Sequence, residues 1–167
     1  FQIFLRDMET GAIRQIAANW DRSADSLTWS PDGNTLYVTA GDVGKTRLFG
    51  VNVRNGIVAP VTEAGHVGAV VATPTGLVYA HDSLTSPSDL WFKAYRGREA
   101  ARRLTNVNPQ LAERAFGQAE QFSFEGWNGE TVHGYVIKPS NYIEGQRYPV
   151  AFLIHGATVG KGIIRSL

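Results

Sequence analysis

The residues of this chain that could do chemistry gather near its end, where small residues follow an apolar run. Val150–Ile154 is followed by His155-Gly156, and Gly160-Lys161-Gly162 comes shortly after. Glycine amides and a lysine after an apolar strand are the groups that hold phosphates in a P-loop. The spacing does not fit that motif, because three residues instead of four separate Gly156 from Gly160, and Gly162 replaces the Mg²⁺-binding hydroxyl. We therefore expect no nucleotide site and no cofactor.

The other histidines stand singly in the sequence. His66, His81 and His133 show no second histidine or carboxylate at the spacing of metal ligands, and the chain contains no cysteine. Zinc sites need several such ligands at short, regular intervals. We therefore expect neither a metal site nor a disulfide framework. We interpret three acids as solvated side chains of loops between strands: Glu63, Asp82 and Asp89.

Three predicted strands lead up to the His155-Gly156 dipeptide. Phe122 and Phe124 alternate with polar residues up to Asn128-Gly129, which favours a hairpin turn, and a return strand follows from Val132 to Lys138. Both faces of the return strand carry apolar side chains, so the pattern does not say which face is buried. Glu120 and Glu125 flank the first strand and could pair with nearby basic residues. Val150–Ile154 is apolar without alternation, which predicts a strand covered on both faces.

A short helix is predicted before this hairpin. Asn108 is a good N-cap, Pro109 suits the first helical position, and residues 110–115 continue with helix-forming types. We interpret this segment as a connector between two domains, because the pattern changes from Thr105 onward.

The first hundred residues repeat. The turn Trp29-Ser-Pro-Asp-Gly33 and the related Ala72-Thr-Pro-Thr-Gly76 each precede an apolar strand, and their prolines are about 43 residues apart. Aromatic segments followed by a glycine recur at similar distances, at Ile3-Phe4, Leu48-Phe49 and Leu90-Trp91. A period of about 40 to 45 residues with four short strands is the signature of a β-propeller blade.

The turn residues support this reading. Pro31 fixes φ at the first central position, Asp32 tolerates the next, and Gly33 supplies a positive φ. We interpret Trp29, Ser30 and Asp32 as turn and core residues. About two blades cannot close a ring, and each blade needs neighbours to bury its faces, so we expect unpaired strand edges and association of the isolated chain.

Composition excludes several classes of protein. The 167 residues permit one domain, or part of one joined to part of another. The net charge of +1 gives no reason to expect nucleic acid or a membrane surface as a partner, and no apolar run approaches the roughly 20 residues that span a bilayer. The start, FQIFLRDMETG, shows no signal peptide and reads as a cut through a strand of a larger protein. Both a cytoplasmic and a periplasmic location stay open, as does the oligomeric state.

Taken in order, the blade repeats, the segment GYVIKP and the segment YPVAFLIHG resemble the prolyl oligopeptidase family of serine peptidases, in particular its dipeptidyl- and acylaminoacyl-peptidase branch. The resemblance implies a mixed fold, with incomplete all-β propeller blades followed by the first strands of an α/β-hydrolase domain. Residues 1–108 would form about two blades. Residues 109–167 would form the connector and the start of the peptidase domain.

The resemblance also assigns candidate oxyanion-hole residues. His155 and Gly156 match the family's His-Gly-Gly-Pro motif, and Ala157 stands at the second glycine, whose backbone N–H helps to hold the oxyanion. Thr158 replaces the proline, and residues 159–167 depart from the family. Two explanations stay open for this tail, a frameshifted or artificially ended reading frame and a genuine divergence. His155 could also merely cap the strand.

The function implied is acyl transfer by a Ser-Asp-His site on short peptides, with the propeller excluding folded proteins. No Gly-x-Ser-x-Gly occurs in the chain, so no triad residue can be assigned and we expect these residues alone to be inactive. Two rivals remain: a β-propeller binding scaffold without a hydrolase, and an α/β-hydrolase esterase with an unrelated N-terminal domain.

Overall fold

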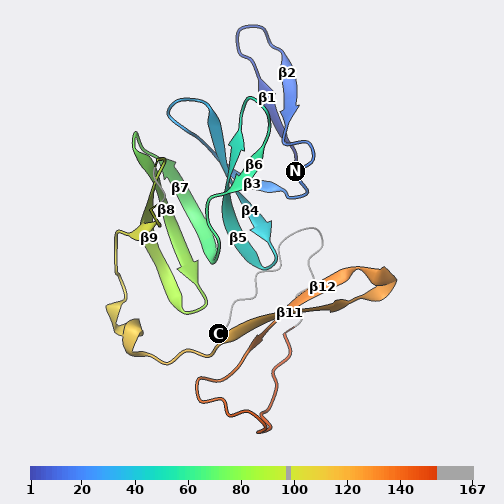
Figure 1. Ribbon diagram of the computed structural model, residues 1–167, viewed down its shortest axis with the longest axis vertical. Helices are drawn as coiled ribbons and strands as arrows, with labels where there is room; N and C mark the ends of the chain where they lie inside the picture. The colour runs from blue at the N-terminus through green and yellow to red at the C-terminus, as the bar shows by residue number, and fades with distance from the viewer. Residues whose placement is uncertain (97–98, 154–167) are drawn as a thin grey trace. The chain divides into compact units, whose positions relative to one another are not determined.

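A computed structural model describes residues 1–96 and 99–153 of the chain (Figure 1). The chain divides into two compact units, Phe1–Val107 and Asn108–Leu167. We describe each unit by itself. The described residues contain no helix with the length and apolar character needed to cross a membrane.

The first unit consists of short antiparallel strands arranged as a repeat. Two sets of four strands, β3–β6 and β7–β10, each pair in sequence order, and one parallel pair, Thr46↔His66, joins β5 to β7. The hairpin β1–β2 precedes them. The bounds are β1 Ile3–Arg6, β2 Ile13–Ile16, β3 Ala24–Trp29, β4 Thr35–Asp42, β5 Lys45–Asn52, β6 Val58–Pro60, β7 His66–Ala72, β8 Gly76–Ser83, β9 Ser86–Ala94 and β10 Arg102–Arg103.

The predicted four-stranded repeat is confirmed. Strands β3 and β7 begin at residues 24 and 66, β4 and β8 at 35 and 76, and β5 and β9 at 45 and 86, so the strands recur every 41 or 42 residues. Hairpin β1–β2 matches the outer pair β5–β6, since both enclose a turn with a glycine at positive φ, Gly11 and Gly56. The carboxylate of Asp7 and the amide oxygen of Asn52 accept equivalent backbone hydrogen bonds in these turns.

The turn after β3 contains the predicted positive φ at Gly33, +69°. The Ser30 hydroxyl donates to Asp32 over 2.6 Å and accepts the N–H of Thr35 over 2.9 Å. In the next repeat, the Thr73 hydroxyl accepts the N–H of Gly76 in the same way. This second turn spans residues 73–75, two fewer than residues 30–34, yet the closing pairs of both hairpins stay regular.

Trp29 was predicted as a core residue, and this is wrong, because 49% of its surface is exposed. The residue ends β3, which pairs only with β4 in the described part of the chain. Because Trp29 ends a strand with no strand neighbour on one side, its side chain is only half covered. Ser30, by contrast, is buried as predicted.

The apolar core of the first unit lies between successive repeats. One cluster joins β1–β2 to β4–β5, and the other joins β5 to β7 and β8. The first contains Ile3, Ile16, Leu36, Val38, Ala40, Phe49 and Val51; the second contains Leu48, Val67, Leu77 and Tyr79. A repeat therefore buries its face only against the next repeat, as expected for such arrays.

The second unit contains one hairpin, β11 Ala119–Glu125 and β12 Thr131–Ile137, with two 3₁₀ turns, η1 Pro109–Glu113 and η2 Trp127–Gly129. The predicted hairpin is confirmed, and Asn128 and Gly129 both have positive φ, 67° and 76°. The connection is longer than two residues, because the N–H of Gly126 donates to the carbonyl of Glu130 and closes it.

The predicted helix over residues 110–115 is only the 3₁₀ turn η1, which ends at Glu113. The Asn108 side chain makes no capping hydrogen bond. Its amide oxygen instead lies 3.4 Å from the Gln110 side-chain nitrogen. Short helices are marginally stable, so a turn of five residues without a cap does not extend into a longer helix.

The strand predicted for Val150–Ile154 does not form over residues 150–153, the part that the structure describes. Val150, Phe152 and Leu153 are 85%, 80% and 64% exposed. A strand that is apolar on both faces needs strand neighbours and covering layers. No described strand pairs with this segment, so its sequence pattern alone does not produce the element.

Candidate functional site

The predicted oxyanion-hole residues His155, Gly156 and Ala157 lie outside the described residues, so their assignment stays a prediction. The structure does describe the segments that lead to them: the hairpin, the loop after it and the exposed residues 150–153.

The loop after the hairpin is held by aromatic and charged contacts. The rings of Tyr142 and Tyr148 lie 5.4 Å apart, and the Tyr148 hydroxyl accepts the N–H of Ile143. The Lys138 ammonium group lies 4.9 Å from the Tyr142 ring centre and 2.6 Å from a Glu120 carboxylate oxygen. The pairing predicted for Glu120 is thus present, and it ties the start of this loop to β11.

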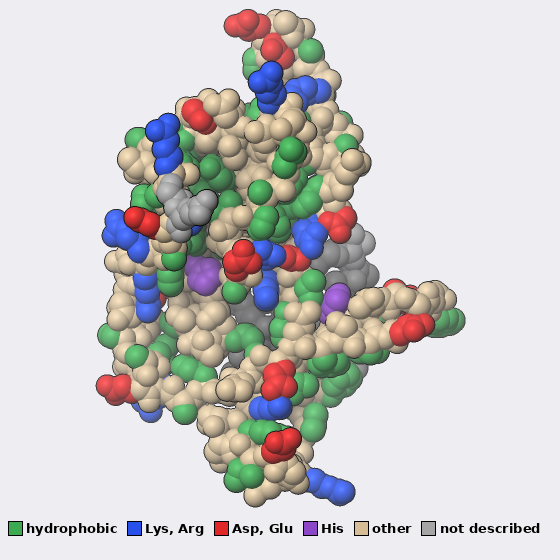
Figure 2. All heavy atoms as spheres, viewed as in Figure 1, with side chains coloured by type: hydrophobic (Ala, Val, Ile, Leu, Met, Phe, Trp, Pro, Cys, Tyr) green, Lys and Arg blue, Asp and Glu red, His purple; other side chains and the backbone are tan. Residues whose placement is uncertain are grey.

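The two faces of the hairpin differ in chemistry. On one face Phe122 and Phe124 stack 6.2 Å apart. The Phe122 ring lies over Gly134, directly opposite in register, where a Cβ would come within 2.4 Å of the ring. On the other face, Ser123 Oγ is 2.7 Å from His133 Nδ1. Hydrophobic side chains remain visible along the hairpin (Figure 2), and the rings of Phe122 and Phe124 are 42% and 54% exposed.

The Ser123–His133 pair joins a hydroxyl to a base, but no carboxylate of the described residues orients the histidine. Among residues 1–96 and 99–153, no hydrogen bond links His133 to a carboxylate. Since a nucleophile–base pair also needs an orienting partner and oxyanion donors, this pair by itself supports no acyl transfer. The Ser123–His133 hydrogen bond instead helps to fix the strand register of the hairpin, because the two residues lie directly opposite each other.

Asp89, an acid of the first unit, was predicted to be a solvated loop residue. It lies within β9 and is 3% exposed, so the prediction is wrong. Its carboxylate accepts hydrogen bonds from the Thr105 hydroxyl at 2.6 Å, from the Val107 N–H at 3.1 Å and from the Arg103 guanidinium. The hydrogen bond from Thr105 above all, with those from Arg103 and Val107, lowers the pKa of Asp89 although burial opposes this shift.

Sequence comparison of the repeats could have found part of this network. Val61-Thr62 and Leu104-Thr105 follow the outer strand of successive repeats. The hydroxyl oxygens of Thr62 and Thr105 accept the N–H groups of Leu48 and Leu90, at 3.0 and 2.9 Å. Each repeat therefore uses a threonine hydroxyl to hold the segment that follows its last strand.

A second charged network connects the ends of β4 and β5 to the segments before β3 and after β6. Asp42 lies 2.6 Å from both Arg22 and Arg47, and Arg47 lies 3.6 Å from Glu63. The hydrogen bond from Arg22, followed by that from Arg47, lowers the pKa of Asp42, and the same bond raises the pKa of Arg22. Glu63 is 91% exposed, which agrees with its predicted solvation.

The remaining histidines of the first unit make local contacts. His66 Nδ1 lies 3.1 Å from Asp82, opposite it in register, so Asp82 is a paired strand residue and not the solvated loop residue that was predicted. His81 Nε2 lies 2.9 Å from the Ala64 carbonyl. Within the described residues, no group of three or more His, Cys, Asp or Glu side chains is arranged to hold a metal ion.

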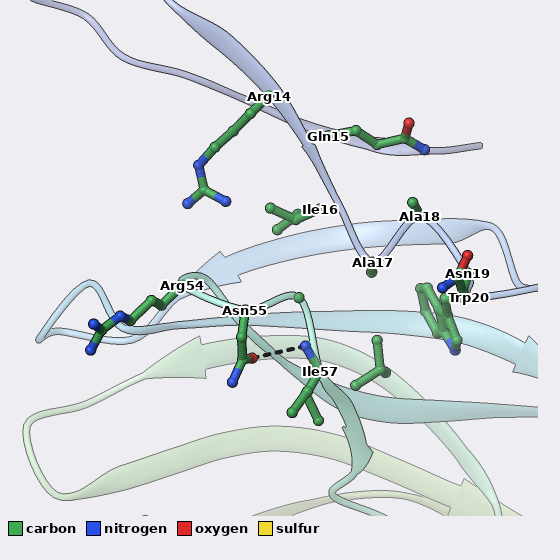
Figure 3. Close-up of a pocket in the computed structure, with 12 residues that line it drawn as sticks. Arg14, Gln15, Ile16, Ala17, Ala18, Asn19, Trp20, Arg54, Asn55 and Ile57 are labelled. Atoms are coloured by element: carbon green, nitrogen blue, oxygen red, sulfur yellow. Dashed lines mark hydrogen bonds between the residues drawn. The ribbon is translucent and has the colours of Figure 1, made fainter.

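A groove of about 530 Å³ lies between β2 with the loop after it and the turn before β6 (Figure 3). Arg14 reaches across it to the carbonyl of Val53 at 2.6 Å, and the Asn55 amide oxygen accepts the N–H of Ile57. Trp20 and Ile57 contribute apolar surface. No serine, histidine or acid is among its described lining residues, so the groove has no nucleophile or general base.

Comparison with known proteins gives a consistent result for both units. No protein-family model matches the chain. Dipeptidyl-peptidase 5 of Aspergillus fumigatus is 32% identical over 160 residues, covering 89% of this chain and 21% of the relative. Dipeptidyl-peptidase 5 of Schizosaccharomyces pombe is 32% identical over 166 residues, covering 96% of this chain and 23% of the relative. The chain thus spans about a fifth of the length of these curated relatives.

Solved structures show the same fold. An acylaminoacyl peptidase in complex with Z-Gly-Gly-Phe-chloromethyl ketone superimposes with a TM-score of 0.71 at 21% identity, over 89% of this chain and 22% of that one. The β-propeller domain of the trilobed protease from Pyrococcus furiosus gives 0.51 at 16% identity, over 64% of this chain and 30% of that one. The strands of the first unit are therefore arranged as in β-propeller domains.

Proposed function

The chain is a segment of dipeptidyl- and acylaminoacyl-peptidase type within the prolyl oligopeptidase family, and from this premise we propose that the full-length protein is a serine peptidase acting on short peptides. The observation that carries the proposal is the identity of 32% over 166 residues, which runs through both the strand repeats and the hairpin unit. A β-propeller that served only as a scaffold would match over its repeats alone.

The two units take different roles in this proposal. Residues 1–108 contribute about two blades of a propeller that limits access to the active site, and residues 109–167 are the connector and the start of an α/β-hydrolase domain. The repeat architecture and the change of pattern after β10 support this division. The reaction is acyl transfer to a serine activated by a histidine, with backbone N–H groups stabilising the oxyanion. The substrates are short peptides, and the proposal involves neither nucleic acid nor a membrane.

Substrate preference of the full-length protein tests the reaction class. We expect hydrolysis of aminoacyl- or dipeptidyl-amides together with p-nitrophenyl esters. Hydrolysis of the esters without the amides would support an esterase, and hydrolysis of neither would support a binding scaffold.

Within this function, the N–H of Ala157 is the proposed oxyanion donor. Replacing Ala157 with proline in the full-length protein removes that N–H without adding a charge, and loss of one such donor costs about 3 to 4 kcal/mol, or roughly a hundred- to thousandfold in rate. Ala157→Gly keeps the N–H and restores the family motif, so it serves as the matched control. A folded Ala157→Pro enzyme with an unchanged rate would place the oxyanion hole elsewhere.

The 167 residues alone are proposed to be catalytically inactive, since they contain no Gly-x-Ser-x-Gly. A fluorophosphonate probe should not label them. Ser123 is the informative position because it hydrogen-bonds His133, so Ser123→Ala is the control. Stoichiometric labelling that disappears in this variant would contradict the proposal and would show that Ser123 acts as a nucleophile.

A further inference from the structure

The segment that ends the first unit converges on one buried carboxylate. The first unit ends at Val107 and the second begins at Asn108. Just before this boundary, the N–H of Leu104 donates to the carbonyl of Leu90 over 2.7 Å, which places residues 103–107 alongside β9. Asp89 precedes Leu90 in β9, and only 1% of its side chain is exposed.

Three different groups of this segment bind the Asp89 carboxylate. One oxygen accepts the Thr105 hydroxyl at 2.6 Å and the Val107 N–H at 3.1 Å, and the other accepts the Arg103 guanidinium. Thr105 is bound twice, because its hydroxyl oxygen also accepts the N–H of Leu90. Hydrogen bonds to an ionised group are roughly twice as strong as neutral ones, so a single side chain restrains residues 103, 105 and 107 together.

In the preceding repeat, different groups hold the segment that follows the outer strand. Leu48 and Leu90 are equivalent, since each donates its N–H to the threonine after the outer strand. The residue before Leu48 is Arg47, whose Nε donates to the Thr62 carbonyl over 2.8 Å. After Thr62 the chain enters the next repeat at His66, the first residue of β7. The Asp89 carboxylate therefore occurs in the last of the strand repeats. It also accepts the backbone N–H of Val107, the last residue of the first unit.

We propose that Asp89 is a positioning residue, a carboxylate lock that fixes residues 103–107 and thereby the point at which the chain leaves the first unit for the second. In the proposed peptidase, the lock fixes the start of the connector on the first unit, and its loss should lower peptidase activity. This last step rests on the proposed function, whereas the lock itself does not.

Amide hydrogen exchange in the full chain tests the lock. In Asp89→Ala, exchange of the Val107 N–H should accelerate by about ten- to hundredfold, the value of a hydrogen bond to a charged group. Thr105→Val should accelerate exchange of the Leu90 N–H, and Thr105→Ser, which keeps the hydroxyl, should restore it. Core amides such as those of Val38 and Leu77 should accelerate less than the Val107 N–H, because they report the stability of the whole unit. Asp82→Asn is the matched control, because Asp82 is a neighbouring strand acid whose pair with His66 is half-exposed.

Unchanged exchange at Val107 in Asp89→Ala would overturn the lock. A parallel rise at Val38 and Leu77 would also overturn it, because Asp89 would then support only the stability of the whole unit. In the full-length protein, at a temperature where every variant is still fully folded, Asp89→Asn should lower kcat/KM for a short peptide severalfold, while Thr105→Ser and Asp82→Asn should not. Faster exchange with unchanged kcat/KM would overturn the positioning role. A wild-type protein without peptidase activity would contradict the proposed function and leave the exchange result as the test of the lock.

Discussion

The two units of this chain differ in how they use apolar surface. The described part of the first unit buries eleven apolar residues between its repeats, seven of them with no more than 2% exposure, among them Leu48 and Val51. The described part of the second unit, residues 108–153, contains no buried residue. Strands can therefore form with regular register in both units, whereas among the described residues only those of the first unit form a core.

The hairpin shows what local chemistry achieves without a core. Positive φ at Asn128 and Gly129 closes the connection, the Phe122 ring covers Gly134, and Ser123 pairs with His133. These contacts fix which residues face each other. An isolated two-stranded hairpin is nevertheless marginally stable in water, so its stability has to come from further packing.

The largest effect should come from removing core volume in the first unit. Leu48 is fully buried in the second apolar cluster, and Leu48→Ala should cost about 2 to 5 kcal/mol through lost burial and the cavity left behind. Thermal or urea unfolding followed by circular dichroism measures this. A loss below about 1 kcal/mol would mean that this cluster does not stabilise the repeats.

A smaller loss is expected from the threonine that follows β6. Thr62→Val keeps the shape but leaves the buried N–H of Leu48 without its partner, which costs about 1 to 3 kcal/mol. Thr62→Ser retains the hydroxyl and should recover most of the loss. Equal destabilisation by both variants would show that the threonine methyl group, and not its hydroxyl, matters.

Acid should weaken the first unit in a graded way. The pKa values of Asp42 and Asp89 lie below their ordinary value of 3.8 in the folded chain, so these carboxylates stabilise the fold above that pH. Their contribution is lost as the pH falls from 3.8 through the folded pKa values. The melting temperatures of wild type and Asp42→Asn should therefore converge on acidification. A difference that stays constant down to pH 2 would contradict the role of Asp42.

The smallest effect on folding should come from the exposed face of the hairpin. Phe124 is 54% exposed, so Phe124→Ser should change the unfolding free energy of the first unit by less than about 0.5 kcal/mol. The same change should reduce association of the isolated chain, because it breaks an apolar patch next to Phe122. Analytical ultracentrifugation measures this, and unchanged association would show that a different surface causes the association.

The sequence predicted the repeats and the hairpin because both depend on short-range signals, such as Gly33, Asn128-Gly129 and the period of the prolines. It failed for Asp89, whose burial depends on Arg103, Thr105 and Val107, 14 to 18 residues further along the chain. It failed for residues 150–153 for a related reason, since a doubly covered strand is defined by its neighbours. The oxyanion assignment of Ala157 rests on family resemblance alone.

The turns between the first two strands of successive repeats tolerate a difference in length. The turns after β3 and β7 differ by two residues, yet the pairs Trp29↔Leu36 and Ala72↔Leu77 close both hairpins in the same way. A hydroxyl side chain, from Ser30 or Thr73, stabilises the turn at each of these positions. Chain length can thus vary here without shifting the strands. An epitope or a fluorophore-labelled peptide inserted between Asp32 and Gly33 should therefore be accommodated, which makes this turn a suitable place for a reporter.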